Sequence, residues 1–392
     1  MKLLHLIATL NPESGGVCQA LRTSIKGLVE IGVDNSVVCL DDEYEEFLKV
    51  DFFKIFPLGK GKGPWCHNKN LINWLTENLN NYDAIILHGL WQFPGYALYN
   101  VFKKLKYKNK YSPALIVMPH GMLDPYFQKA EGRKIKAIRN ILYWQIVEKN
   151  LVNNADALFF TCEEERYLAS TYFRPYKPKK TFIVSLGVPF PSLDFKKIIP
   201  ITKHKSLLFL SRIHPKKGID LLVDAYSEII TENKNSLLPN LIIAGPGLET
   251  DFGNGIYNCV QANSHIKNKI SFPGMLTGRA KWEAFYNCEA FILPSHQENF
   301  GIAVVEALAC GKPVLITDKI NIWREILVDK AGIVESDTKE GVKSLIKKWL
   351  DFSDAKKKEM GKSAVECYNS NFTVDMAATK MYDALSDIIE TC

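Results

Sequence analysis

The chain has 392 residues, more than one hydrophobic core usually supports, so two domains are expected. Its 47% hydrophobic and 23% charged residues exclude a disordered or fibrous protein. A net charge of +6 is too small for a dedicated nucleic-acid binder, and it suits anionic small molecules or an anionic membrane surface as partners.

The cysteines, the histidines and the N-terminus indicate a compartment. Nine cysteines are scattered without a Cys-x-x-Cys spacing, which predicts free thiols in a reducing environment. No pair among the eight histidines has metal-ligand spacing, so no metal site is expected. The apolar residues 1–10 lack the features of a signal peptide, and no apolar run approaches the ~20 residues that span a bilayer. We expect a cytoplasmic protein whose membrane contact is at most peripheral.

The first half of the chain alternates short apolar runs with helical patterns, as βαβ units do. Strands are predicted at 3–10, 36–40, 84–87, 115–118, 157–161 and 182–184. Helices are predicted at 17–30, 71–79, 134–151 and 163–172. Residues 1–190 should therefore form one doubly wound domain.

A stretch rich in Pro and Lys interrupts this alternation at 191–205 and predicts a linker. A second doubly wound domain is predicted over 206–371, and a C-terminal helix over 372–392 that packs back on the first domain. The strands of this second domain are expected at 207–210, 241–244, 270–272, 290–293 and 314–316, and its helices at 219–231, 281–287, 302–309 and 341–351. Ligands of such sheets bind beyond the carboxyl ends of the strands, so functional residues should directly follow strands.

A basic loop follows the predicted strand 207–210. Residues 211–218 read Ser-Arg-Ile-His-Pro-Lys-Lys-Gly and place Arg212 and Lys217 ahead of a helix. An arginine can bind two phosphate oxygens and a lysine adds a compact charge, so this pair suits a diphosphate. Taken alone, the residues also fit a solvated basic loop.

Two glutamates flank the start of the helix that follows the strand 290–293. Glu298 lies in the loop and Glu306 inside the helix. Backbone N–H groups of residues 299–302 could bind an anion or an oxygen-rich ligand, and the carboxylates could accept hydrogen bonds from two hydroxyl-bearing rings. The alternative is a favourable charge at a helix start together with a surface glutamate.

These segments carry a resemblance to a known family. Residues 294–314, with Glu298-x-Phe300-Gly301 and Glu306 before Ala-Leu-Ala-Cys-Gly-Lys-Pro-Val, resemble the signature of glycosyltransferase family 4, retaining enzymes of the GT-B fold. Arg212-x4-Lys217-Gly218 resembles that family's diphosphate loop. The likeness continues at Gly15-Gly16, Pro119-His120-Gly121 and Ser185-Leu186-Gly187-Val188, and Pro119–Leu123 resembles bacterial members that build surface polysaccharides. The resemblance implies an α/β fold of two Rossmann-like doubly wound domains that face each other across a cleft.

The resemblance also implies roles for single residues. The donor would be a nucleotide-diphosphate sugar, with no metal or other cofactor, and the acceptor a glycan or a lipid-linked saccharide. Arg212 and Lys217 would bind the diphosphate, Glu306 the ribose, and Glu298 the transferred sugar. Further donor contacts are implied for Gly16, Gly245, Met275, Leu276, Asn299, Phe300 and Gly301. Two positions depart from the family pattern, Ser211 in place of Gly and Leu186 in place of Asn.

One histidine is a catalytic candidate beside Glu298, Arg212 and Lys217. His120 follows the predicted strand 115–118, where the family places a histidine near the reacting carbon. A core or capping histidine is the alternative. His88 also follows a strand and is interpreted as structural, and Trp91 as a core residue.

The mechanism that the resemblance implies retains the anomeric configuration without a protein nucleophile, and a phosphate oxygen takes the acceptor's proton. The sequence contains no Asp-x-Asp, so the cationic loop would replace a metal. Three alternatives stay open: a nicotinamide-dependent oxidoreductase, for which residues 245–250 lack the third glycine, a non-catalytic nucleotide-sugar-binding protein, and an epimerase or phosphorylase on the same scaffold.

Basic and apolar residues also lie together in the first domain. The predicted helix 134–151 bears Ile135, Ile138, Leu142 and Trp144 beside Arg133, Lys134, Lys136 and Arg139, and Lys103, Lys104, Lys106, Lys108 and Lys110 follow another helix. This pattern suits a helix that docks on an anionic membrane near a lipid-linked acceptor. A helix of this pattern more often packs its apolar stripe on its own sheet, which is the alternative.

Overall fold

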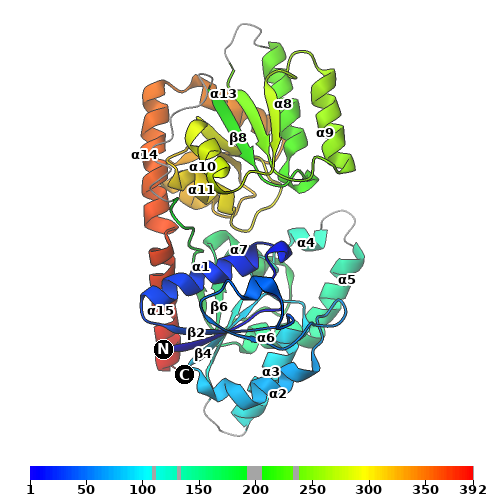
Figure 1. Ribbon diagram of the computed structural model, residues 1–392, viewed down its shortest axis with the longest axis vertical. Coiled ribbons are helices and arrows are strands. Elements are labelled where there is room, and N and C mark those ends of the chain that lie inside the picture. Colours follow the sequence, from blue (N-terminus) through cyan, green and yellow to red (C-terminus); the bar gives the residue numbers. More distant parts are fainter. Residues whose placement is uncertain (108–111, 130–133, 192–204, 233–237, 392) are drawn as a thin grey trace. The chain divides into compact units, whose positions relative to one another are not determined.

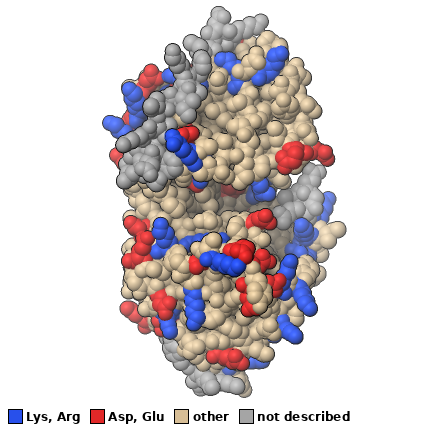
Figure 2. All heavy atoms as spheres, in the orientation of Figure 1, with Lys and Arg blue, Asp and Glu red and all other residues tan. Residues whose placement is uncertain are grey.

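The computed structural model describes residues 1–107, 112–129, 134–191, 205–232 and 238–391 (Figure 1). The chain forms two compact units. The first comprises Met1–Gly187 together with Val374–Cys392, and the second comprises Val188–Thr373. Acidic and basic side chains are interspersed over the face shown in Figure 2, as expected for a small net charge.

A parallel sheet in the order β3-β2-β1-β4-β5-β6-β7 forms the first unit. The central strands β4 and β5 are buried at every residue, because helices cover both faces of a parallel sheet. The strands are β1 Lys2–Leu6, β2 Asp34–Cys39, β3 Lys54–Pro57, β4 Ala84–His88, β5 Ala114–Met118, β6 Ala157–Phe160 and β7 Thr181–Ile183. The strand order reverses between β1 and β4, which places the crevice of this sheet beyond their carboxyl ends.

The helices of the first unit are α1 Gly16–Glu30, α2 Lys69–Asn78, α3 Phe93–Tyr107, α4 Tyr126–Lys129, α5 Lys134–Tyr143, α6 Lys149–Asn154 and α7 Glu163–Tyr172. The helix predicted at 134–151 is divided, because a π-helical turn, Trp144–Glu148, separates α5 from α6. The Trp144 ring is buried, stacks on Phe173 with 4.9 Å between centroids, and donates from Nε1 to the Arg174 carbonyl at 3.1 Å. We attribute the extra residue in this turn to these contacts.

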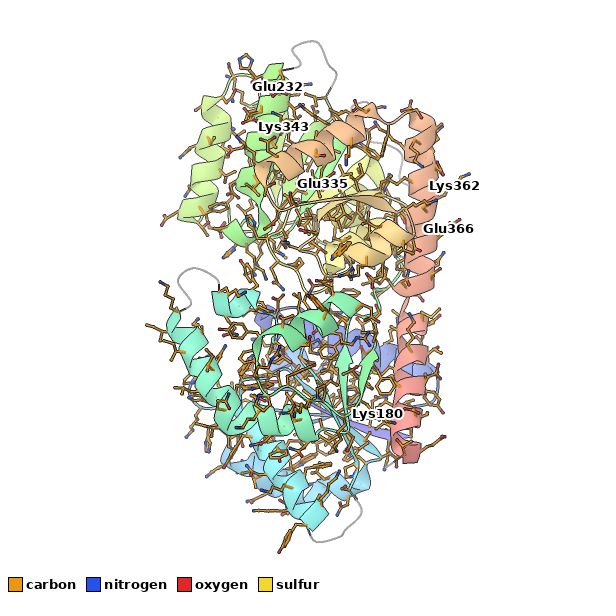
Figure 3. All side chains as sticks on the ribbon, turned by 180° about the vertical axis from the view of Figure 1, so that it is seen from behind. Lys180, Glu232, Glu335, Lys343, Lys362 and Glu366 are labelled. Carbon is orange, nitrogen blue, oxygen red and sulfur yellow. The ribbon has the colours of Figure 1, made fainter. Side chains whose placement is uncertain are left out.

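The second unit contains a parallel sheet in the order β10-β9-β8-β11-β12-β13. Its strands are β8 Ser206–Leu210, β9 Asn240–Ala244, β10 Ile270–Gly274, β11 Ala290–Leu293, β12 Val314–Thr317 and β13 Gly332–Glu335. Its helices are α8 Ile219–Glu232, α9 Asp251–Ala262, α10 Gly278–Asn287, α11 Ile302–Ala309, α12 Trp323–Val328, α13 Lys339–Asp351 and α14 Asp354–Asn371. Figure 3 shows Lys343 of α13 beside Glu232 of α8, and their side chains form an ion pair of 2.6 Å.

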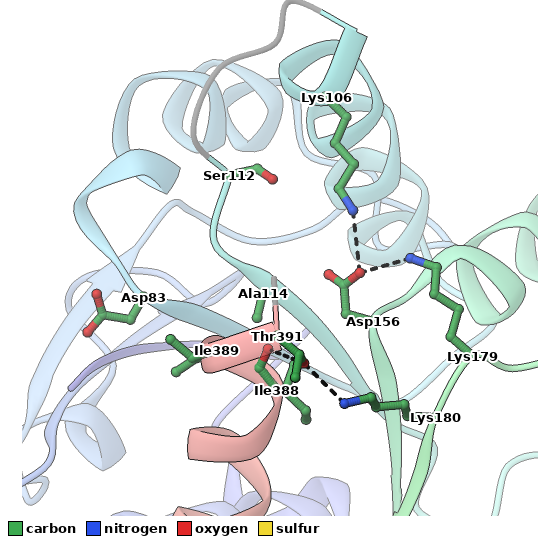
Figure 4. Close-up of a pocket in the computed structure, with 10 residues that line it drawn as sticks. All are labelled: Asp83, Lys106, Ser112, Ala114, Asp156, Lys179, Lys180, Ile388, Ile389 and Thr391. Atoms are coloured by element: carbon green, nitrogen blue, oxygen red, sulfur yellow. Dashed lines mark hydrogen bonds and ion pairs between the residues drawn. The ribbon is translucent and has the colours of Figure 1, made fainter.

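The last helix, α15 Val374–Thr391, belongs to the first unit, so the end of the chain lies in the same unit as its start (Figure 1). It packs on α1 at Gly27, where a Cβ would lie 2.8 Å from that of Ala378. Lys180, next to β7, bonds to Asp387 and Thr391 of α15 at 3.1 Å each. These contacts border a cavity at the amino ends of the strands (Figure 4).

The boundaries between the units differ slightly from those predicted. The first unit ends at Gly187 rather than at residue 190, because Val188 donates to the Phe372 carbonyl at 2.9 Å and accepts from the Tyr368 hydroxyl at 2.8 Å. These bonds attach residue 188 to the end of α14. Most of the predicted linker, residues 192–204, lies outside the described residues.

Candidate functional site

The second sheet reverses its strand order between β8 and β11. The basic loop follows β8 and the glutamate loop follows β11, so both leave the same edge at the reversal. Gly218 lets them approach: its φ is +63°, and a Cβ there would lie 2.0 Å from the Pro294 carbonyl oxygen. The His296 N–H also donates to the Lys216 carbonyl at 2.9 Å. Two loops that are 80 residues apart in sequence thus form one surface.

Lys217 and Glu298 form the centre of that surface. Lys217 ends a 3-10 turn, Pro215–Lys217, and its Nζ lies 2.5 Å from Oε1 of Glu298. The two side chains are only 11% and 20% exposed. Glu298 is fixed by its backbone, which donates to the Lys319 carbonyl at 2.8 Å and accepts from the Asn321 N–H at 3.0 Å. The carboxylate and the ammonium are therefore held in place before any ligand arrives.

Arg212 adds an exposed positive charge to the same loop. The pKa of His214 is lowered by burial first and then by the positive charges of Arg212, Lys216 and Lys217. The His214 ring accepts from the Lys216 N–H at 3.1 Å, which shapes the turn. The loop thus carries a fixed positive field suited to an anion.

Glu306 has a cationic partner that the sequence did not predict. Its Oε1 lies 2.7 Å from Nζ of Lys281 on α10, and the two side chains are 13% and 23% exposed. The Lys281 ammonium also lies over the Trp282 ring, 4.3 Å from its centroid. The sequence does not predict this pair, because the two residues lie on different helices and are 25 positions apart.

The start of α11 lies between the two glutamates. Gly301 is its N-cap residue with a φ of +80°. Phe300 is buried and packs edge-on against Phe372 at 5.6 Å, so its ring is not open to a ligand.

Three further predicted donor residues lie on the loops after β9 and β10. Gly245 has a φ of +146°, and a Cβ there would lie 1.9 Å from the Ser211 carbonyl oxygen, so a glycine is needed for the close approach of these loops. Its N–H donates to the Gly274 carbonyl at 2.8 Å. Met275 and Leu276 follow, the first 69% exposed and the second half-buried. All predicted donor residues of the second unit therefore lie at one edge of its sheet or at the adjoining start of α11.

The remaining predicted residues, Gly16 and His120, belong to the first unit. Gly16 is the exposed first residue of α1, which follows β1. His120 follows β5 in a left-handed conformation with a φ of +51°. The next N–H, of Gly121, donates to the buried Glu165 carboxylate at 2.5 Å. A strained, externally held conformation of this kind is typical of functional loops.

Trp91 lies in the core, as the sequence analysis interpreted it. It is 9% exposed and contacts Trp144 and Phe173. Its N–H donates to the fully buried Glu148 at 2.6 Å. Burial raises the pKa of Glu148 to about 8, against which this hydrogen bond acts. These residues fix the loop after β4 and are not exposed to a ligand.

Comparison with known proteins identifies the second unit. Residues 192–366 match the family model described as glycosyl transferases group 1. The second unit is therefore similar to group 1 glycosyl transferases. The matched range contains both cation–carboxylate pairs, Lys217–Glu298 and Lys281–Glu306.

Curated proteins that match this chain share limited identity with it. A D-inositol 3-phosphate glycosyltransferase of Jonesia denitrificans is 24% identical over 253 residues, which are 60% of this chain and 58% of that protein. A mannosylfructose-phosphate synthase of Agrobacterium fabrum is 28% identical over 125 residues, 31% of this chain and 27% of the synthase. The matched part of the chain thus spans about half or less of these relatives.

Solved structures show a likeness in fold over the whole length of this chain. A glycosyltransferase of Rickettsia africae superposes with a TM-score of 0.76 at 16% identity, covering 100% of this chain and 99% of the other. The Anabaena protein Alr3699/HepE in complex with UDP and glucose has a TM-score of 0.72 at 17% identity, with 99% and 100% covered. These comparisons confirm the expected fold class, two doubly wound α/β domains of the GT-B type.

Proposed function

We propose that this chain is a retaining glycosyltransferase that moves a sugar from a nucleotide-diphosphate sugar to an acceptor without a metal or other cofactor. The observation that supports it most is the pair of cation–carboxylate contacts at the strand reversal of a unit similar to group 1 glycosyl transferases. In the Lys217–Glu298 contact, an anion can replace the carboxylate and a polyhydroxylated ligand can replace the ammonium. A nucleotide sugar provides both.

The donor would occupy these positions by exchange. The diphosphate would draw Lys217 away from Glu298, with Arg212 as the second cation, and the freed Glu298 would accept hydroxyls of the transferred sugar. Glu306 would accept the ribose hydroxyls and remain neutralised by Lys281. Gly245, Met275, Leu276 and the backbone of Asn299, Phe300 and Gly301 would complete the donor contacts. In the first unit, Gly16 and His120 are the residues to which the resemblance gives a role toward the donor.

The chemistry that follows needs position and charge rather than a nucleophile. As the bond from the anomeric carbon to the diphosphate breaks, negative charge grows on the leaving oxygen, and Arg212 and Lys217 would stabilise it. The acceptor hydroxyl attacks from the face that the diphosphate leaves, and a phosphate oxygen takes its proton. The product keeps the donor's anomeric configuration.

Donor selection comes first in the test of this proposal. UDP and UDP-sugars are natural first candidates, because a structural neighbour of the same fold binds UDP and glucose. A ligand present at 100 times its dissociation constant stabilises a protein by about 2.7 kcal/mol, so a thermal-shift panel of nucleotide sugars identifies the donor. Sugar acceptors, including phosphorylated ones such as the relatives' names suggest, are then tested with it.

We expect full turnover in excess chelator and a product with the donor's anomeric configuration, read from the coupling constant of the anomeric proton in fresh product. Loss of turnover that metal restores would contradict metal independence. An inverted product would contradict retention. Binding without transfer to any acceptor would instead favour a non-catalytic nucleotide-sugar-binding protein.

We also propose that the first unit docks on the cytoplasmic face of an anionic membrane through α5, where a lipid-linked acceptor in surface polysaccharide assembly would lie. The apolar residues Ile135, Ile138 and Leu142 are 85%, 61% and 59% exposed, so they do not pack on the sheet. Trp144, grouped with them on sequence, is instead buried in the core. Among the described residues no helix is long and apolar enough to cross a bilayer.

Basic residues border the exposed stripe of α5. Lys134 and Lys136 are exposed, and Arg139 is half-buried with its guanidinium 5.3 Å from the centre of the Trp65 ring. Lys103, Lys104 and Lys106 lie within α3 rather than after it, because the helix continues to Tyr107. Arg133, Lys108 and Lys110 lie outside the described residues.

Replacing Lys134 and Lys136 together by Gln is expected to weaken binding to anionic liposomes by roughly 30-fold, since each basic residue near such a surface contributes about 1 kcal/mol. Sedimentation with anionic and neutral liposomes, at low and high salt, measures it. Replacing the exposed Lys267 and Lys358 of the second unit by Gln is the matched control and should leave binding unchanged. Equal, negligible binding of the unaltered protein to both liposome types would contradict docking.

A further inference from the structure

Three histidines from neighbouring strands form one hydrogen-bonded chain in the first unit. His5 lies within β1, His88 ends β4, and His120 directly follows β5. Nδ1 of His5 lies 3.0 Å from Nε2 of His88, and Nδ1 of His88 lies 3.0 Å from Nε2 of His120. Consecutive rings are stacked with 5.3 Å between centroids. The chain thus runs from the centre of the sheet to the candidate sugar-contacting residue.

The inner end of the chain fixes its direction. Asn35 of β2 has its Nδ2 2.9 Å from the Val33 carbonyl, which can only accept a hydrogen bond. The amide oxygen of Asn35 must therefore face His5, whose Nε2 lies 3.0 Å from it. Because that oxygen can only accept, Nε2 of His5 must carry a proton.

A neutral imidazole has one donor and one acceptor nitrogen, so the proton position on His5 also determines the proton positions on His88 and His120. His5 accepts at Nδ1, and His88 must then donate from Nε2. His88 in turn accepts at Nδ1, and His120 must donate from Nε2. Nδ1 of His120 is left as a bare acceptor, and within the described part of the chain no residue hydrogen-bonds to it.

The surroundings keep all three rings neutral. Burial lowers the pKa of His5 and of His120 to about 4. The pKa of His88 is also lowered well below its usual value, by burial first and then by the adjacent His120 and His5. Asn35 is the other group that acts on these pKa values, through its bond to His5, and no carboxylate of the described residues does so. A charged ring would present two donors and oppose a neighbour's N–H.

We propose that Asn35, His5 and His88 are positioning residues that hold His120 in a single neutral tautomer, with Nδ1 as a hydrogen-bond acceptor for a sugar hydroxyl. This inference rests on the proposed function, since it gives His120 a sugar to contact. The left-handed backbone of His120, held through the Gly121–Glu165 bond, fixes the ring from the other side. The site would thus favour a sugar with a hydroxyl donor at that position.

Imidazole nitrogen NMR of protein labelled with 15N-histidine tests the tautomer without any substrate. We expect a protonated Nε2 and a bare Nδ1 for His5, His88 and His120 between pH 6 and 9, with signals assigned from single His→Asn variants. A protonated Nδ1 on His120, or a cationic ring at pH 7, overturns the proposal. Because this readout needs no turnover, it stays decisive if no transferase activity is found.

Two variants at position 88 separate positioning from folding. His88→Leu removes the acceptor for His120, and we expect a mixture of His120 tautomers and roughly 10- to 100-fold lower kcat. His88→Asn keeps a side-chain oxygen near the place of Nδ1 and should restore most of the rate and the single tautomer. The exposed His265→Asn is the control for the substitution itself. Equal rates and tautomers in His88→Leu and wild type overturn the proposal.

Asn35→Asp tests the inner end of the chain. A carboxylate beside Nε2 of His5 raises the pKa of that ring, and a protonated His5 donates from Nδ1, which reverses the next two bonds. The variant should lose activity as the pH falls through the raised pKa, over a range in which the wild-type rate is constant. Parallel pH profiles of the two proteins would contradict the proposed coupling.

Discussion

Replacing Lys217 by Ala is expected to lower kcat by roughly 10² to 10³, the usual effect of losing one group that stabilises charge in a transition state. Its Nζ lies 2.5 Å from Glu298 at the strand reversal, and in the proposed exchange it moves from this carboxylate to the diphosphate. Arg212→Ala should act in the same direction, and because Arg212 is exposed it should do so without a change in stability.

Initial rates with the identified donor, beside thermal unfolding of each variant, measure this. Lys216→Ala removes the same charge from the neighbouring position of the same turn and is the matched control. We expect it to keep most of the wild-type rate. Wild-type turnover in both Lys217→Ala and Arg212→Ala would refute the assignment of this loop to the diphosphate.

The second large effect concerns Gly218→Ala. The residue has a φ of +63°, and its added Cβ would lie 2.0 Å from the Pro294 carbonyl oxygen, a backbone atom that cannot rotate away. Strain at positive φ costs about 1–3 kcal/mol and overpacking about as much again, so the free energy of unfolding should fall by roughly 2–6 kcal/mol. The loops carrying Lys217 and Glu298 must separate, and turnover should fall with stability.

Denaturant unfolding of the purified variants gives the change in free energy. Gly255→Ala in α9 is the matched control, because no atom lies within 4 Å of its added Cβ and its backbone is helical. An alanine there should stabilise the protein by up to about 1 kcal/mol. A Gly218→Ala protein with the free energy of unfolding of wild type would contradict this prediction, because the two loops could then separate without loss of stability.

The sequence predicted those elements that an apolar run or a helical pattern marks clearly. Strand 290–293 and the helices 163–172 and 302–309 agree with the structure at both ends, since continuous apolar runs and clear periodicity mark them. The edge strands β3 and β13 were not predicted, because Lys54 and Glu335 break their short apolar pattern, whereas the edge strands β7 and β10 were predicted. Packing of Trp144 divided a helix that periodicity alone makes continuous.

The site was predictable only as far as residues follow strands. Arg212, Lys217 and Glu298 were found by that rule and by the family resemblance. Their partners were not, because Lys281 meets Glu306 from another helix and His5 meets His88 from another strand. His88, interpreted as structural, is the central member of the histidine chain. Contacts of this kind depend on strand order and register, which local patterns do not specify.

The last helix, α15, belongs to the first unit although it follows the second in the chain, and this has a consequence for biosynthesis. Six residues of α15 are buried in the first unit: Ala377, Ala378, Met381, Ala384, Leu385 and Ile388. A ribosome makes them only after the entire second unit. The first unit therefore leaves the ribosome with the α1 surface around Gly27 uncovered. This apolar surface must avoid aggregation and non-native contacts while about 190 further residues are translated. Completion of the N-terminal half is thus coupled to synthesis of the C-terminal half.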